Sequence, residues 1–339
     1  MKRILECVPN VSEGQRPELL ALMAETIDSI SGVHLLHQDT GHSAHRTVFT
    51  FAGEPAGVVE AAFQLIRIAA EQIDMRQHQG IHPRMGATDV CPLVPVAGIR
   101  MEEVVKLSQQ LGKRVGEELG IPVYLYEASA TAPHRRNLAA IRKGEYEGFR
   151  EKIYHPDWRP DFGPQEFQAH CGQTVIGARD FLVAYNVNLA SPSVELAKEI
   201  AAEIRESGRK IKQGEAWIRR PGTCKSLKAI GWWIEEFGEV QVSMNLTRLS
   251  DTNLQEAYEA VKAAAQRRGG VVSGSELIGL IPLAAILQAG KYYLTKEGQS
   301  STISEQDVIQ AAISGMGLDQ IVPFDPQKKV LEYRLQAGN

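Results

Sequence analysis

The sequence predicts a protein of the α/β (α+β) class, made of two lobes with a ligand tunnel or cleft between them. Short apolar runs of strand length alternate with longer segments whose apolar residues recur at helical spacing. A stretch rich in proline and glycine, residues 154–172, interrupts this pattern near the middle of the chain. The element order βαββαβ occurs on both sides of it, so we expect one lobe at residues 1–180 and the other at residues 181–339.

In the first lobe, an apolar run is followed by a turn-rich segment and then by an amphipathic helix. Residues 46–52 (RTVFTFA) have the composition of a strand, and a proline opens the strongly helical segment that follows. The expected elements are strands at 4–8, 33–37, 46–52, 90–96 and 123–126, and helices at 18–30, 55–73, 102–119 and 137–146. The first six in chain order give the ferredoxin-like arrangement, an antiparallel sheet with both helices on one face.

The second lobe repeats this order without a residue-level repeat. A strand is expected at 181–188, a helix at 193–206, a hairpin at 227–234 and 240–246, a helix at 253–267 and a strand at 270–273. The two lobes are therefore predicted to share a ferredoxin-like βαββαβ topology.

Composition excludes several classes of protein. The 339 residues include 37 Lys or Arg and 41 Asp or Glu, a net charge of −4, so nucleic acid is not an expected partner. No window approaches the roughly 18 apolar residues of a membrane helix, and Glu6 falls where a signal peptide would be apolar. We expect a cytoplasmic protein with no membrane contact. Its four cysteines are too sparse for a disulfide framework and are expected to be reduced and mostly buried: Cys7, Cys91, Cys171 and Cys224.

Histidines concentrate the candidate chemistry in the first lobe, because all nine lie within the first 170 residues. Two polar loops, 37–46 and 78–89, both precede strands of the same predicted sheet. We expect these loops to converge and to place Asp39, Arg46, His82 and Arg84 within reach of one ligand.

Two interpretations of these loops compete. The spacings His42-x2-His45 and His78-x3-His82 could bind a metal ion, which leaves a metal-dependent hydrolase open, but the neighbouring arginines would repel a cation and we expect no metal. General acid–base work by His82 is favoured, because Pro83 stiffens the loop and imidazole titrates near neutral pH. Arg46 and Arg84 could clamp carboxylates, or could pair with Asp39 or Asp89.

A basic stretch at residues 205–228 holds eight Lys or Arg and two Glu. It is either a solvated loop or a surface that attracts a polyanionic small molecule. Phosphate-loop, dinucleotide-binding and serine-hydrolase motifs do not occur in the sequence.

Several long strings resemble the glutamate formiminotransferase family over nearly the whole chain. They are residues 6–14 (ECVPNVSEG), 46–51 (RTVFTF), 82–92 (HPRMGATDVCP), 122–126 (PVYLY), 160–164 (PDFGP), 177–179 (GAR) and 279–283 (GLIPL). The resemblance implies transfer of the formimino group of N-formimino-L-glutamate to N5 of tetrahydrofolate, the co-substrate, in histidine degradation. It also implies a two-subdomain fold with a folate tunnel, usually in a homodimer, here in a form that lacks the cyclodeaminase domain and needs a separate cyclodeaminase.

The resemblance also implies roles for individual residues. His82 would be the catalytic histidine and Asp39 its supporting acid. The folate-contacting segment would comprise Gly163, Pro164, Gln165, Glu166, Phe167, Gln168, Ala169, His170, Cys171 and Gly172. Two departures from animal members are His45, where they have Asn, and the absence of a Trp before Gly172.

Taken together, the residues suggest one mechanism. His82 would accept the N5 proton during attack and return it to the departing glutamate nitrogen, with Asp39 holding its ring. The donor would be bound by Asn10, Ser12, His45, Arg46, Arg84 and Gly86, and a polyglutamyl tail of folate by the basic stretch. An N-formylglutamate:tetrahydrofolate formyltransferase stays open, since formyl and formimino groups differ only in O versus NH. An RNA-binding module would need Phe49 and Phe51 on an exposed sheet face, and the acidic charge argues against it.

Overall fold

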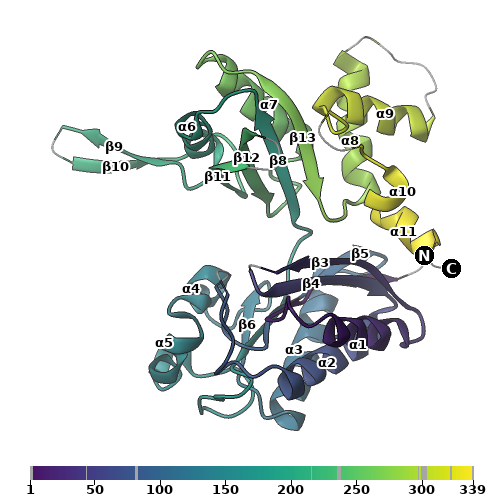
Figure 1. Ribbon diagram of the computed structural model, residues 1–339, viewed down its shortest axis with the longest axis vertical. Helices are drawn as coiled ribbons and strands as arrows, with labels where there is room; N and C mark the ends of the chain where they lie inside the picture. Colours follow the sequence, from purple (N-terminus) through teal and green to yellow (C-terminus); the bar gives the residue numbers. More distant parts are fainter. Residues whose placement is uncertain are drawn as a thin grey trace. The chain divides into compact units, whose positions relative to one another are not determined.

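The computed structural model describes residues 3–42, 44–80, 83–214, 216–234, 238–296, 298, 304–320 and 323–337. Contacts within the chain divide it into two compact units, Met1–Arg179 and Asp180–Ala337 (Figure 1). Each unit is described by itself.

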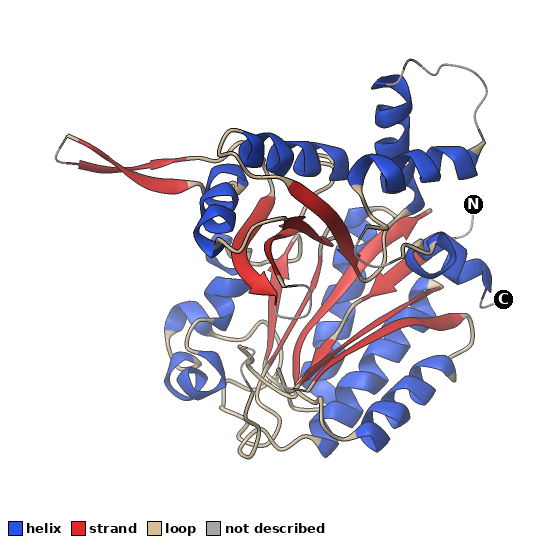
Figure 2. Ribbon diagram, turned by 45° about the horizontal axis from the view of Figure 1, so that its top comes forward, coloured by secondary structure: helices blue, strands red, loops and turns tan. Residues whose placement is uncertain are grey.

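The first unit contains the predicted ferredoxin-like sheet. The order β3-β4-β1-β5 is antiparallel throughout, and the short β2 continues the line of β1 between β4 and β5. Helices α1 and α2 pack against each other, and residues of α1, α2 and α3 share one hydrophobic core with the sheet (Figure 2). The elements are β1 (Ile4–Cys7), β2 (Asn10–Val11), α1 (Pro17–Asp28), β3 (Val33–Gly41), β4 (Arg46–Gly53), α2 (Pro55–Gln72), β5 (Thr88–Ala97) and α3 (Met101–Glu118).

Two further strands extend this antiparallel sheet, and they pair in parallel with β5 and with each other. The strand β6 (Val123–Glu127) was predicted, whereas β7 (Thr174–Ala178), which lies between β5 and β6, was not. The helix predicted at 137–146 is two helices, α4 (Leu138–Arg142) and α5 (Glu145–Lys152). Gly144 separates them with a φ of +94°, a left-handed conformation that a helix interior does not allow.

The core of this unit rules out the RNA-binding interpretation. Phe49 and Phe51 alternate along β4 and are fully buried in the cluster that also contains residues of α1 and α2. Their rings are therefore unavailable to stack on bases.

The second unit has the predicted order β8, α6, β11, β12, α7, β13. Its antiparallel sheet runs β11-β12-β8-β13, which is again the ferredoxin-like order. The elements are β8 (Val183–Leu189), α6 (Val194–Ile204), β11 (Leu227–Ile234), β12 (Glu239–Leu246), α7 (Leu254–Gln266) and β13 (Val272–Ile278). The prediction of two βαββαβ lobes is confirmed.

Two parts of the second unit were not predicted. The middle of the basic stretch forms a hairpin of β9 (Arg209–Gln213) and β10 (Ala216–Arg220) that projects from the unit, where a loop was one of the two predictions (Figure 1). After β13 come α8 (Leu283–Lys296), α9 (Glu305–Met316), α10 (Pro326–Lys329) and α11 (Leu331–Ala337). No helix within the described ranges has the length and apolar character needed to cross a membrane.

All four cysteines are free thiols, as predicted. Cys7, Cys91 and Cys224 are buried, and Cys171 is half-buried. Burial raises the pKa of the Cys7 thiol, and the neighbouring Cys91 raises it further, so this thiol is held in its neutral form.

Candidate active site

The two polar loops of the first unit meet, as the sequence predicted. The imidazole rings of His45 and His78 stack with their centroids 4.2 Å apart and their planes 18° from parallel. His45 Nδ1 lies 2.7 Å from the carbonyl oxygen of Gln79, and His78 Nε2 lies 2.9 Å from the carbonyl oxygen of His45. Each ring is thus bonded to the backbone of the opposite loop.

Glu13 anchors this junction from the turn before α1. One carboxylate oxygen accepts the backbone N–H groups of Gly14, Gln15 and Arg16, at 2.8 to 3.0 Å. The other accepts from Arg16 Nε at 2.6 Å, and His45 Nε2 lies 3.3 Å from the first. Burial alone would raise the pKa of Glu13, but these hydrogen bonds outweigh it and the pKa is lowered. Glu13 is therefore a carboxylate at neutral pH.

Arg84 has different ion-pair partners from those predicted. Its guanidinium binds Glu147 at 2.7 and 2.9 Å and Glu145 at 3.3 Å, and neither Asp39 nor Asp89 is a partner in these ion pairs. Hydrogen bonding to Glu147 raises the pKa of Arg84 despite partial burial. The sequence could not indicate this pairing, because Glu145 and Glu147 are about 60 residues away in α5.

The loop that leads into β5 is held through its backbone by contacts with Ser12 and Gly172. Ser12 Oγ donates to the carbonyl of Gly86 at 2.8 Å, and Gly86 forms a β-bridge with Gly172. A Cβ on Gly86 would lie 2.3 Å from Gln173 O, and one on Gly172 would lie 2.4 Å from Met85 O. Only glycine allows this approach, which joins residues 85–86 to the end of the predicted folate segment.

A buried ion pair lies at the start of β5. Asp89 Oδ2 accepts from Arg142 at 2.5 Å, and Asp89 Oδ1 accepts the Met85 N–H at 3.1 Å. The pairing register with β2 shifts between Val90 and Thr88, so Asp89 occupies a bulge. Burial raises the pKa of Asp89, and Arg142 opposes that effect.

Asp39 and Arg46 belong to the β3–β4 hairpin. Asp39 is exposed and pairs in register with Val48, while Arg46 pairs with Gly41. Burial lowers the pKa of Arg46, and the charges of Asp39 and Asp89 act in the opposite direction. Asp39, Arg46 and Asp89 are therefore electrostatically coupled, but Arg84 belongs to a separate set of ion pairs.

The predicted folate segment curves around α5 and the end of α2. Tyr146 OH donates to Ala169 O at 2.5 Å, and the Tyr146 and Phe167 rings lie 5.1 Å apart. The carbonyl of His170 accepts the Met75 N–H at 2.7 Å, and its ring Nδ1 lies 3.8 Å from Asp74. The segment therefore reaches the residues that follow α2.

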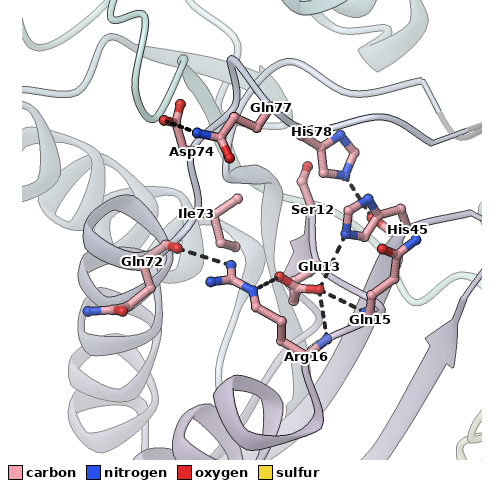
Figure 3. A pocket seen from close by; sticks show the side chains of 10 residues that line it. All are labelled: Ser12, Glu13, Gln15, Arg16, His45, Gln72, Ile73, Asp74, Gln77 and His78. Carbon is pink, nitrogen blue, oxygen red and sulfur yellow. Dashed lines mark hydrogen bonds and ion pairs between the residues drawn. The ribbon is translucent and has the colours of Figure 1, made fainter.

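A pocket of about 400 Å³ lies at the junction of Glu13, His45 and His78 (Figure 3). It is lined by Ser12, Glu13, Gln15, Arg16, His45, Gln72, Ile73, Asp74, Gln77 and His78. Its volume lies within the range of small-molecule sites. Of the predicted donor-binding residues, Ser12 and His45 line the pocket. Gly86 does not line it, but its carbonyl accepts a hydrogen bond from Ser12.

Asn10, Asp39, Arg46 and Arg84 do not line this pocket. Asn10 pairs with β4 and β5, and its side-chain amide donates to Val8 O at 3.2 Å. His82, the predicted catalytic residue, lies outside the described residues.

Sequence reasoning missed Glu13 and His78 as site residues. Glu13 lies inside the string at residues 6–14, and a carboxylate just before a helix is the available signal. His78 precedes the more conspicuous His82 by four residues. Within the ranges that the structure describes, no three His, Cys, Asp or Glu side chains are grouped so as to hold a metal ion.

Comparison with known proteins adds to this geometry. Residues 4–179 match the model of the formiminotransferase domain, N-terminal subdomain, and residues 184–336 match that of the formiminotransferase domain. The chain belongs to the formiminotransferase family. A glutamate formimidoyltransferase of Streptococcus pyogenes serotype M1 is 45% identical over 297 residues, 88% of this chain and 95% of that protein.

Two further family members differ in length. The glutamate formimidoyltransferase of Thermoplasma acidophilum is 41% identical over 312 residues, 91% of this chain and 98% of that protein. The formimidoyltransferase-cyclodeaminase of Gallus gallus is 46% identical over 338 residues, which cover 100% of this chain and 61% of that protein. The chain thus spans about three fifths of the bifunctional relatives that it matches.

Proposed function

We propose that this chain is a glutamate formimidoyltransferase, which transfers the formimino group of N-formimino-L-glutamate to N5 of tetrahydrofolate and releases L-glutamate. The observation that carries the proposal is the match, over 95% and 98% of their lengths, to two relatives named for this activity. The meeting of both polar loops at one pocket supports it, because group transfer needs proton-transfer groups and binding groups together.

In this proposal the two units are the N-terminal and C-terminal formiminotransferase subdomains. The matched ranges, 4–179 and 184–336, fall within the two contact-defined units. The folate tunnel or cleft between them stays a prediction.

The residues present around the pocket fit tetrahydrofolate as co-substrate. A pterin presents a flat face and an edge of N–H donors, and the segment at 163–172, which does not itself line the pocket, offers the half-buried Phe167 ring beside Tyr146. Asp74 provides a carboxylate in the pocket wall, and Gln72 and Gln77 provide amides. The pKa of Asp74 is lowered to about 2 by its hydrogen bonds with Arg76, so this carboxylate is charged and accepts hydrogen bonds at neutral pH.

Proton transfer is assigned to His82 in this proposal. Its imidazole would accept the proton of the attacking amine and return it to the departing glutamate nitrogen, and Asp39 would hold the ring. In the β3–β4 hairpin, burial lowers the pKa of Arg46 and the charge of Asp39 acts in the opposite direction, so the carboxylate and the guanidinium interact electrostatically.

Arg84 is proposed to bind a carboxylate of the donor. Its side chain is only 11% exposed, while those of Glu145 and Glu147 are 43% and 65% exposed. A fixed guanidinium that holds exposed carboxylates can exchange them for a substrate carboxylate. Asn10, Ser12, His45, Arg46 and Gly86 are retained as proposed donor-site residues, with Ser12, His45 and Gly86 acting through the backbone segments that they hold in place.

The hairpin β9–β10 is proposed to bind the polyglutamyl tail of folate. Arg209 lies opposite Arg220, and Lys210 lies opposite Arg219. Like charges placed directly opposite destabilise a hairpin, and a polyanion would relieve this repulsion. Tri-glutamylated tetrahydrofolate should have a lower KM than the monoglutamate, and Arg219→Gln should remove this difference. Equal KM values for the two folates in the unmodified protein, or an unchanged difference in Arg219→Gln, would refute the assignment.

The activity is tested with purified protein, tetrahydrofolate and either N-formimino- or N-formyl-L-glutamate. Acid quenching converts the product to methenyl-folate, which is measured by its absorbance. The proposal expects product from the formimino donor, whereas product mainly from the formyl donor would assign a formyltransferase. His82→Ala should abolish turnover with donor binding retained, and near-normal kcat in this variant would refute the role of His82.

Two predictions about the protein as a whole belong with this function. The predicted homodimer is tested by analytical ultracentrifugation. A sedimentation coefficient that corresponds to a 37.3 kDa monomer at micromolar concentration would contradict the prediction. The cytoplasmic location stays a prediction from composition.

A further inference from the structure

The stacked histidines at the wall of the pocket have a hydrogen-bond pattern that specifies their protons. His78 Nδ1 lies 3.3 Å from Arg84 Nε, which is always a donor, so Nδ1 must carry a lone pair. His78 Nε2 then carries the proton and donates to the carbonyl of His45. His78 is therefore neutral and held in a single tautomer.

Burial favours the same state. His78 is 6% exposed, and its pKa is lowered first by burial and then by the charges of His45 and Arg84. A second proton would place an N–H of His78 against the N–H of Arg84, with no acceptor between them.

His45 has the opposite environment, with a carbonyl acceptor at Nδ1 and a carboxylate within ion-pair distance of Nε2. Nδ1 faces the carbonyl of Gln79 at 2.7 Å, and Nε2 faces the Glu13 carboxylate at 3.3 Å. A neutral ring has one N–H and would leave a lone pair facing one of these oxygens. The imidazolium presents an N–H toward each of these oxygens and places its positive charge beside the Glu13 carboxylate.

The charged groups around the pair come from four elements. Glu13 and Arg16 lie before α1, Asp74 follows α2, Arg84 precedes β5, and Glu147 lies in α5. Arg84 is neutralised by Glu145 and Glu147, and Asp74 is paired with Arg76. Glu13 is the negative group next to His45, and Arg16 shares it.

The backbone at this junction is strained and close. His45 has a φ of +48°, which non-glycine residues rarely adopt. Gly80 passes so near that a Cβ there would lie 2.5 Å from Ala44 O and 2.8 Å from His45 Cβ. The reciprocal ring-to-backbone bonds are what hold this strained approach together.

We propose that His45 and His78 form a latch, with His45 as an imidazolium and His78 as the neutral Nε2–H tautomer. The latch fixes residues 78–80, two to four positions before His82 in the chain, against the end of the β3–β4 hairpin. Both histidines are positioning residues: they act through the loop that carries His82. The kinetic consequence rests on the proposed function, and the protonation states rest on the geometry alone.

The protonation states are tested by NMR of the full chain labelled with ¹⁵N-histidine. At pH 7 the latch requires two protonated ring nitrogens on His45, and on His78 a protonated Nε2 with a bare Nδ1. His45→Asn and His78→Leu assign the signals. A His45 ring with one proton, or a His78 ring with a proton on Nδ1, would overturn the latch whatever the enzyme's activity.

The positioning role is tested with paired variants. In His78→Gln the side-chain amide can still accept from Arg84 and donate to the carbonyl of His45, so kcat should stay within about threefold. In His78→Leu and His45→Asn, loss of the latch should lower kcat about 10- to 100-fold with a smaller change in KM. His34→Asn, at the other end of β3, is the matched control and should change neither.

Hydrogen exchange gives a readout that does not depend on turnover. Amides of residues 76–80 and 84–86 should exchange faster in His78→Leu than in the unmodified protein, and His78→Gln should restore protection. Equal exchange and equal kcat in the Gln and Leu variants would refute the positioning role. Absence of transfer by the unmodified protein would refute the proposed function instead, since the NMR result does not depend on it.

Discussion

Replacing Asp89 with alanine should destabilise the first unit by about 3 kcal/mol. Asp89 is 1% exposed, and its two oxygens accept from Arg142 and from the Met85 N–H. Removing one member of a buried ion pair costs ~3–5 kcal/mol, because the partner's charge is left uncompensated. The orphaned amide adds ~1 kcal/mol. Arg142 is 19% exposed and can turn toward water, which reduces the loss from the ion pair to ~2 kcal/mol and gives a total of about 3 kcal/mol.

Two further variants separate these contributions. Asp89→Asn keeps an acceptor for the Met85 amide, so it should cost about 1 kcal/mol less than Asp89→Ala. Combining Asp89→Ala with Arg142→Met removes both charges, and the double variant should be more stable than the sum of the single effects predicts by ~2 kcal/mol.

Protonation of Asp89 gives this prediction a pH dependence. Burial raises its pKa in the folded protein, so the folded state holds the proton more tightly than the unfolded chain. The contribution of this carboxyl to stability is therefore fully present below pH ~4 and is lost as pH rises through the folded pKa. The Asn side chain does not titrate, so the stability advantage of the unmodified protein over Asp89→Asn should widen as pH falls through the folded pKa of Asp89.

The assay is native-state hydrogen exchange of peptides from β5, which reports on the first unit alone. The unfolding free energy is taken from protection factors at low denaturant. A loss below ~1 kcal/mol for Asp89→Ala would refute the reasoning. So would an additive double variant, since the pair would then carry no coupling.

Three other changes test the site. Gly86→Ala would force a Cβ to 2.3 Å from Gln173 O, so kcat/KM for transfer should fall at least ~10-fold, whereas Gly148→Ala, with nothing within 4 Å, should leave it unchanged. Tyr146→Phe removes the donor to Ala169 O, so the KM for tetrahydrofolate should rise about fivefold while that for the donor stays constant in steady-state kinetics. The lowered pKa of Glu13 means that its stabilising effect is present above pH ~4.5 and lost as pH falls through the folded pKa. Glu13→Gln should therefore show a flatter decline of Tm between pH 5 and 3, and parallel declines would contradict the lowered pKa.

The ferredoxin-like order could be predicted because its elements differ in period. Residues 46–52 show strand alternation, and residues 55–73 keep helical spacing over five turns. The strand β7 was not predicted from the sequence because its five residues are all buried and follow an irregular proline-rich segment. A short, fully buried parallel strand has no polar alternation to reveal it.

The hairpin β9–β10 was not predicted because its residues are exposed, whereas those of β7 are buried. All of its residues except Ile211 are exposed among those the structure describes, so it lacks the apolar face by which strands are found. Its register is set by backbone pairing between Arg209–Gln213 and Ala216–Arg220, which composition does not encode.

Convergence of the polar loops could be predicted from topology, but the pairing within them could not. Both loops precede strands of one sheet, which allows them to converge, but the sequence did not indicate that His45 and His78 make the contact. Which carboxylate binds Arg84 depends on where α5 packs, and this position is decided by Tyr146 and Phe149 in the core. Distant partners of this kind leave no signal in local sequence.

The central claim is tested most directly by following the transferred carbon in a single turnover. N-formimino-L-glutamate labelled with ¹³C in the formimino group is mixed with tetrahydrofolate and excess enzyme, and the label is observed by NMR. The account predicts that the label moves to N5 of the folate while an equal amount of free glutamate is released. Label released into water as formamide or formate, with tetrahydrofolate unchanged, would contradict it.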